Sequence, residues 1–225
     1  MATLPQPVIF FGHGSPMNAI AQNHFTHSWQ QQVADLTGPR RPKAILLVSA
    51  HWYGKGLKIT GQLQPSTLHD FGGFPPELFA FDYPAKGAPQ LAGHIQQLLL
   101  PIKTELDQSW GYDHGSWSVL AHAFKDADIP LLQLSLDGSK PPQWHLALGQ
   151  KLARLRQQGV LIIGSGMSFH NMQAFFRQDL VSDAQVDAFN QYFIDSLQPQ
   201  YSYAEQAKRL INWQQAPDAR LMHPR

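Results

Sequence analysis

Runs rich in Val, Ile and Leu constrain the fold of this 225-residue chain more than any other feature. Gly, Ser and Pro bound these runs, which is typical of buried strands. We place strands at residues 7–11, 44–49, 130–135 and 159–164, with a weaker one at 57–61. Nearly every position in the runs is apolar, so we expect both faces of the sheet to be covered by helices.

Helical periodicity separates the predicted strands. We expect helices over residues 89–100, over 142–159 with Gly159 as the stop, and over 182–197 with Ser182 as the N-cap. Strands that alternate with helices favour an α/β fold, and the length suits one sizeable core. The sequence therefore predicts a single α/β domain over residues 1–225, with a central, largely parallel or mixed sheet flanked by helices.

Composition excludes several classes of protein. The formal net charge is +1, so no global field favours nucleic acid or an anionic membrane as a partner. The chain has no cysteine, which rules out disulfides, thiolate nucleophiles and Cys-type zinc sites. No apolar run is long enough to cross a bilayer, and no signal peptide precedes the first strand. We expect a cytoplasmic protein.

Three histidines follow the ends of apolar runs. "VIFFGHGSPM" delivers His13, "ILLVSAHW" delivers His51 and "VLIIGSGMSFHN" delivers His170. Ligands of open α/β sheets gather outside the carboxyl ends of the strands, so these rings are expected to converge. Neutral imidazole is a common ligand of iron, zinc and copper, which predicts a metal site. The alternative is that each is a loop histidine bonded to the backbone.

A second group of candidates lies outside these runs. In "GYDHGSWSVL", His114 precedes a helix expected to start near Ser116, and is either a proton donor or a helix-capping turn residue. Its neighbour Asp113 either orients a ring or is an ordinary turn acid. The aromatic loop at 66–89 offers Phe71, Phe74 and Phe79, which either wall the site and exclude water or anchor the loop by ordinary aromatic packing.

A serine-nucleophile reading fits less well. Ser15 and Ser165 lie near histidines, but neither "GHGSP" nor "GSGMS" is a G-x-S-x-G elbow.

Seven motifs in register carry a family resemblance. They are "FGHGSPMNAI", "VSAHWY", "HDFGGFPPELF", "YPAKGAP", "GYDHGSWSVL", "PLLQLSLD" and "GSGMSFHN". Together they resemble the DOPA-dioxygenase-like branch of the class III (LigB-type) extradiol ring-cleavage dioxygenases. The resemblance implies a LigB-like α/β sheet with a non-haem divalent metal at one edge. It also implies O2-dependent cleavage of a catechol, a small aromatic diol, next to its hydroxyl groups.

The resemblance assigns roles to four histidines. His13 and His51 match metal ligands, His170 matches a position that is a metal ligand or an acid–base, and His114 matches a further site histidine. Catalysis is thereby expected of His170 and His114, and metal binding of His13, His51 and His170. The implied cofactor is one divalent metal, Fe(II) for activity or Zn(II) as purified, with O2 as co-substrate.

One departure keeps other functions open. The family continues past "HPR" with an acidic residue, a histidine and a Leu- and Pro-containing strand, whereas this sequence ends at Arg225. We therefore expect a form truncated before a final strand and one ligand. The alternatives are a zinc-dependent hydrolase on the same scaffold, and a catalytically incomplete protein that binds a metal or small molecule.

Overall fold

The computed structural model describes residues 4–38, 40–177 and 179–224. The chain divides into two compact units, Met1–Gly166 and Met167–Arg225, which are described one at a time. The first unit holds the sheet, and the regular elements in the described part of the second unit are helices. Among the described helices, none combines the length and apolar character that crossing a membrane requires.

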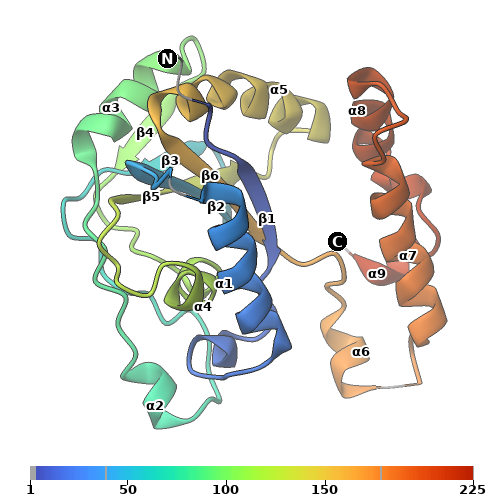
Figure 1. Ribbon diagram of the computed structural model, residues 1–225. Helices are drawn as coiled ribbons and strands as arrows, with labels where there is room; N and C mark the ends of the chain where they lie inside the picture. Colours follow the sequence, from blue (N-terminus) through green and yellow to red (C-terminus); the bar gives the residue numbers. More distant parts are fainter. Residues whose placement is uncertain (1–3, 39, 178, 225) are drawn as a thin grey trace. The chain divides into compact units, whose positions relative to one another are not determined.

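The first unit is built on a six-stranded sheet (Figure 1). Its strands are β1 (Val8–Gly12), β2 (Ala44–Gly54), β3 (Leu57–Thr60), β4 (Thr104–Asp107), β5 (Leu131–Asp137) and β6 (Val160–Gly166). Their spatial order is β1-β6-β2-β5-β3-β4. The β1–β6, β6–β2 and β2–β5 pairs are parallel, whereas β3 runs antiparallel to β5 and parallel to β4. The predicted mixed α/β sheet is confirmed.

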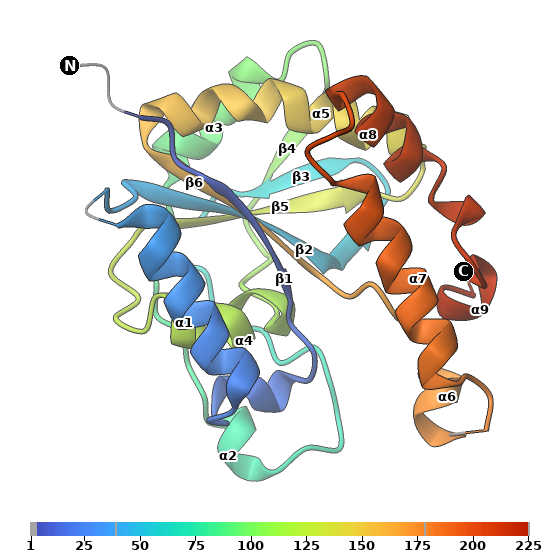
Figure 2. The same cartoon turned by 45° about the vertical axis from the view of Figure 1, so that its right-hand side comes forward.

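Helices cover both faces of this sheet, as the uniformly apolar strands require. Alternate residues of β2 separate the two cores: Ile45 and Leu47 point to one, Ala44 and Leu46 to the other. The first core is covered by η1 (Pro16–Ala19), α1 (His24–Thr37) and α4 (His114–Ala123). The second is covered by α3 (Pro89–Leu98), α5 (Pro142–Leu152) and η2 (Ala153–Gln158). Figure 2 shows α1 and α4 on one side of the sheet and α3 and α5 on the other.

The boundaries differ from prediction in ways that matter for the site. Strand β2 continues past Ser49 to Gly54, so His51 lies within the strand rather than after it. Helix α4 begins at His114, two residues before the expected Ser116, because the carbonyl of Asp113 already accepts the N–H groups of Ser116 and Trp117. Gly159 ends η2 in the left-handed region, at φ +91°, as the stop signal predicted.

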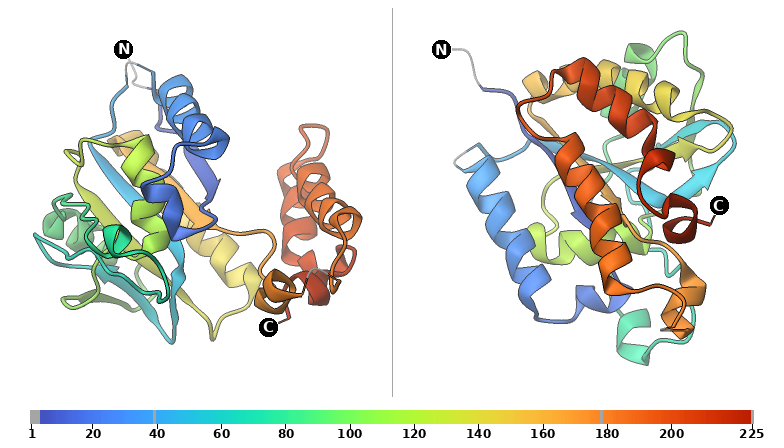
Figure 3. Two further views of the ribbon diagram at one scale, coloured as in Figure 1. Left: turned by 90° about the horizontal axis from the view of Figure 1, so that it is seen from below. Right: turned by 90° about the vertical axis from the view of Figure 1, so that its right-hand side faces the viewer.

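The second unit contains α6 (Met172–Phe176), α7 (Asp183–Ser196), α8 (Tyr203–Ile211), η3 (Trp213–Gln215) and α9 (Ala219–Met222), coloured orange to red in Figure 3. Ser182 caps α7 as predicted, and the Gln185 side chain returns the bond in a capping box. Its core is small, with Phe189 and Met222 fully buried.

Candidate metal centre

His13 is delivered by the end of β1. The strand stops at Gly12, and Gly14 adopts a positive φ of 64° that turns the chain away directly after the histidine. The turn is held by Asn18, whose side-chain amide donates to the His13 carbonyl at 3.0 Å. The imidazole is almost fully buried, with 3% of its surface exposed. It therefore points into the protein rather than into solvent.

His51 lies where β2 loses its regular pairing with β5. The register shifts between Val48 and Tyr53, as at a β-bulge, and His51 falls inside the irregular stretch. Bulges re-aim side chains and are common beside active sites. The backbone N–H of His51 donates to the Ser49 hydroxyl at 3.2 Å, which helps to hold the irregular stretch.

His114 is the first residue of α4 and is buried. Strands β1 and β2 flank β6 and run parallel to it, so their carboxyl ends meet at one edge of the sheet, and the start of α4 lies at that edge. The ring centroids of His51 and His114 are 3.9 Å apart, and those of His13 and His114 are 5.6 Å apart. One potential ligand nitrogen from each of the three histidines lies within 4.8 Å of the others.

Asp70 contacts two of these rings. Its Oδ1 lies 2.8 Å from Nδ1 of His114 and accepts the His114 backbone N–H at 3.0 Å, and its Oδ2 lies 3.4 Å from Nδ1 of His51. Burial alone would raise the pKa of Asp70, but the bonds from His114 outweigh it and hold the pKa below its usual value. At neutral pH the carboxylate is therefore ionised and can only accept hydrogen bonds.

These contacts fix which nitrogen of each ring carries a proton. An ionised Asp70 requires a donor at Nδ1 of His114, which leaves Nε2 of the neutral ring with its lone pair free. The hydroxyl of Ser165, on β6, donates to the Gly115 carbonyl, so its oxygen accepts from Nδ1 of His13 at 3.0 Å. His13 and His114 therefore present Nε2 as the ligand atom, and Asp70 favours the same tautomer for His51.

The arrangement fits a divalent cation. Nε2 of His13 and Nε2 of His51 are 3.2 Å apart, and two lone pairs at that separation repel unless a proton or a cation lies between them. Two imidazoles on one ion, at usual metal–nitrogen lengths, place their nitrogens about 3.0–3.4 Å apart. Rings whose Nδ1 groups are already anchored are pre-oriented for such an ion.

The hydrogen bonds described for the Asp113 carboxylate come from side chains other than histidine, and its role in orienting a ring stays a prediction. Asp113 accepts hydrogen bonds from the Ser49 hydroxyl at 2.6 Å and from the Gln133 side-chain amide. Burial raises its pKa to about 6, although the Ser49 bond acts in the opposite direction. Because Ser49 also accepts the His51 backbone N–H, Asp113 helps to hold the His51 backbone in place through Ser49.

The aromatic loop reaches the site through Phe71. Its ring packs edge-on against His114, with centroids 5.5 Å apart, and also contacts Phe74 and Phe79. Phe71 and Phe74 are partly buried against the core, whereas 43% of Phe79 is exposed. Of the three phenylalanines suggested by the sequence, Phe71 is the one in contact with a site histidine.

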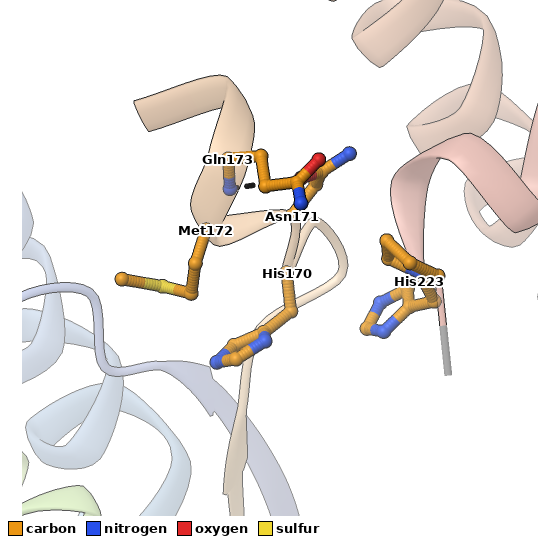
Figure 4. A pocket seen from close by; sticks show the side chains of 6 residues that line it. His170, Asn171, Met172, Gln173 and His223 are labelled. Atoms are coloured by element: carbon orange, nitrogen blue, oxygen red, sulfur yellow. Dashed lines mark hydrogen bonds between the residues drawn. The ribbon is translucent and has the colours of Figure 1, made fainter. Parts of the chain in front are cut away.

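His170 belongs to the second unit. With His223 it lines a pocket of about 320 Å³, and Figure 4 shows the two side chains beside this pocket. Their rings are stacked with centroids 6.4 Å apart, and His223 Nε2 contacts the Ser168 carbonyl. Burial lowers the pKa of His223. The role expected of His170 in catalysis and metal binding stays a prediction.

Comparison with known proteins identifies the family. Residues 6–219 match the family described as the catalytic LigB subunit of aromatic ring-opening dioxygenase. The chain belongs to the LigB family. A 4,5-DOPA dioxygenase extradiol of Escherichia coli K12 is 49% identical over 174 residues, which are 77% of this chain and 63% of that protein. A Beta vulgaris protein of the same name is 40% identical over 168 residues, covering 72% of this chain and 61% of its own.

A solved structure shares the fold of this chain. It is that of the uncharacterized protein JW3007 of Escherichia coli K12, which is 38% identical and superposes with a TM-score of 0.79. The match covers 98% of this chain and 83% of JW3007. The chain spans less than two thirds of the length of the two DOPA dioxygenases to which it is similar.

Sequence reasoning missed Asp70 and the supporting role of Ser165. Asp70 shares its loop with Glu77 and Asp82, and nothing in the sequence singles out one of these acids. The sequence suggested Ser165 as a nucleophile, a role that fitted less well. In the structure the Ser165 hydroxyl forms a hydrogen bond with Nδ1 of His13 and anchors that ring. Both contacts join residues far apart in sequence, 44 positions for Asp70 and His114 and 152 for His13 and Ser165.

Proposed function

We propose that this LigB protein is an extradiol dioxygenase that cleaves the aromatic ring of a DOPA-like catechol with O2 at one non-haem divalent metal. The observation that carries the proposal is the cluster of three imidazoles, in which Nδ1 of His13 and Nδ1 of His114 are anchored by Ser165 and Asp70. The names of the relatives supply the substrate class, a small aromatic diol. The cytoplasmic location expected from the sequence is part of the same proposal.

His13 and His51 are the proposed metal ligands, with Fe(II) as the active ion and Zn(II) as the ion that purified protein can carry. A ferrous ion supplies a centre at which the two diol oxygens and O2 are held next to each other. His13 and His51 are neutral ligands in the tautomers described, so the charge of the ion remains available to attract an anionic diol. His170 is proposed as a further ligand or acid–base, as the family resemblance predicts.

His114 is suited to move a proton. Its Nδ1–H is held by Asp70, so its Nε2 can accept a proton from the diol, and Asp70 stabilises the imidazolium that results. The same tautomer would serve if His114 bound the ion instead. Phe71, packed against this ring, offers an apolar edge that limits access of water beside it.

The reaction is tested with protein loaded with Fe(II) under anaerobic conditions. Addition of aerated DOPA or related catechols should give O2 uptake and a yellow semialdehyde-type product. His13→Ala, His51→Ala and His170→Ala should each lose most of the turnover, and a His145→Ala variant, in helix α5, serves as the histidine control.

Flat O2 traces across the catechol panel with iron bound would refute the dioxygenase. Zinc-dependent ester or amide turnover without O2 uptake would support the hydrolase alternative. Bound metal without either activity would support a binding protein.

A further inference from the structure

Asp70 is the only residue in the described part of the chain for which we find one carboxylate shared between two histidines of the metal centre. Oδ1 takes the ring and backbone N–H groups of His114, and Oδ2 faces Nδ1 of His51. We propose that Asp70 is the positioning residue of the site, which orients both rings toward one metal ion and joins the aromatic loop to metal binding. This inference rests on the metal site of the proposed function.

The loop holds Asp70 rigidly enough for this role. Before it, Leu68 donates its N–H to the Tyr112 carbonyl at 2.7 Å, and its own carbonyl accepts the indole N–H of Trp117 at 2.9 Å. After it, the Phe71 ring contacts both Trp117 and the His114 ring. Asp70 is thus fixed on both sides by the turn and helix that carry His114, and a carboxylate fixed in this way can set the orientation of a ring.

The outer part of the loop is closed by separate contacts. Thr67 donates its hydroxyl to Asp82 at 2.6 Å and accepts the Tyr83 N–H at 2.9 Å, and His69 Nε2 lies 3.0 Å from the Phe81 carbonyl. Asp82 is therefore a matched control for Asp70. It is an acid in the same loop that also accepts a hydrogen bond, but its bonding partner is Thr67 and not a histidine.

The proposal is tested by metal affinity measured directly, without turnover. Zn²⁺ and Co²⁺ are titrated into metal-free wild-type, Asp70→Asn, Asp82→Asn and His13→Ala proteins, and the Co²⁺ ligand-field spectrum is recorded. Asp70→Asn should bind about 10- to 100-fold more weakly, as is usual when a residue that orients a metal ligand is lost, and should change the spectrum. Asp82→Asn should match wild type.

Equal affinity of Asp70→Asn and wild type would overturn the proposal, and so would an equal loss in Asp82→Asn. If His13→Ala binds metal as well as wild type, the metal site of the proposed function fails as a whole. Loss in His13→Ala without loss in Asp70→Asn overturns only the role of Asp70.

A double-mutant cycle tests whether Asp70 acts through His114. The loss caused by Asp70→Asn should be smaller in a His114→Ala background than in wild type. Losses that simply multiply would show that Asp70 does not act on metal binding through His114, and would overturn that half of the proposal.

A second measurement uses the wild-type protein alone, so it does not depend on whether any variant folds. Nitrogen-15 NMR of the imidazoles in the metal-free wild-type protein should show His114 as the Nδ1–H tautomer. Finding the Nε2–H tautomer there would overturn the proposal.

Discussion

Gly115, the second residue of α4, matters for the side chain that it lacks. A Cβ atom built there would lie 2.5 Å from the Ser49 hydroxyl and 2.8 Å from Cδ2 of His51. Ser49 is fully buried and bonded to Asp113, so it cannot move aside at low cost. The position of His51 therefore depends on a glycine in a neighbouring helix.

Gly115→Ala should displace His51 and lower Zn²⁺ affinity by at least about tenfold, because the ring that it pushes is a proposed ligand. Isothermal titration measures the loss. Gly149→Ala, at an exposed position of α5 with nothing within 4 Å, is the control. It should raise the unfolding free energy by about 0.5–1 kcal/mol and leave metal affinity unchanged. Unaltered zinc affinity in Gly115→Ala would contradict the packing argument.

Asp107 contributes a pH-dependent part of the folding stability that can be measured by changing this one residue. Burial alone would raise the pKa of Asp107. Hydrogen bonds from the backbone N–H groups of Trp110 and Ser109, the Ser109 hydroxyl and the Lys58 ammonium outweigh burial and lower the pKa to about 2. A folded-state pKa below the unfolded value means that the unfolded state binds more protons. The stabilisation is therefore complete above about pH 4 and is lost as the pH falls through about 2.

Asp107→Asn should be less stable than wild type at pH 7 by on the order of 1 kcal/mol. That difference should shrink as the pH falls from 5 to 3. Urea unfolding of both proteins across this pH range measures the difference. The other carboxyl groups titrate in both proteins, so a change in the difference with pH reports on Asp107 alone. A gap that stays constant with pH would show that Asp107 is not held ionised by these contacts.

At the scale of elements, apolar strands were predictable and polar ones were not. The central strands carry Val, Ile and Leu on both faces because helices cover both faces, and such apolar runs are recognisable in the sequence. Strand β4 reads TELD and lies at the sheet edge, where one polar side can face solvent, so no pattern marked it. Helix α1 buries only Trp29 and Val33 among its large apolar residues, too few to give a clear period.

The site was predictable only in part for a related reason. His13 follows a recognisable strand and His51 lies near the carboxyl end of another, so their convergence follows from the parallel strands around β6. The contact of Asp70 with His114 depends on how the long loop between β3 and α3 returns to the start of α4. A single β-bridge between Thr67 and Tyr112 fixes that return, and no local periodicity encodes it.

Gly111 allows this return of the loop. A Cβ atom at Gly111 would lie 2.0 Å from the Ser66 backbone carbonyl, which accepts the Tyr112 N–H. Gly111→Ala should therefore break the bridge and cost about 1–3 kcal/mol of unfolding free energy, with a further loss of metal affinity through Asp70. Gly72→Ala, in the same loop with open space around it, should change neither quantity. Chemical denaturation and metal titration of both variants check this.

At the scale of the whole molecule, the three clustered histidines couple metal binding to the folding of the unit that holds the sheet. The three clustered histidines and Asp70 all belong to the unit Met1–Gly166, although η1, α1, β2 and β3 separate Asp70 from His13 along the chain. An ion that binds only the assembled cluster stabilises the folded state by mass action. The second unit has its own small core and described helices.

Zn²⁺ should therefore raise the melting temperature of the transition that unfolds the sheet. At a free concentration 100 times the dissociation constant, the stabilisation is about 2.7 kcal/mol, which corresponds to about 5–10 °C for a unit of this size. Calorimetry with and without chelator measures the shift.

Two controls test whether the shift comes from the histidine cluster. Mg²⁺ should not raise the melting temperature, because it prefers oxygen ligands to imidazole. A double variant, His13→Ala with His51→Ala, should lose the zinc response, since it lacks the two Nε2 atoms that lie 3.2 Å apart. An undiminished shift in that variant would place the zinc elsewhere in the chain.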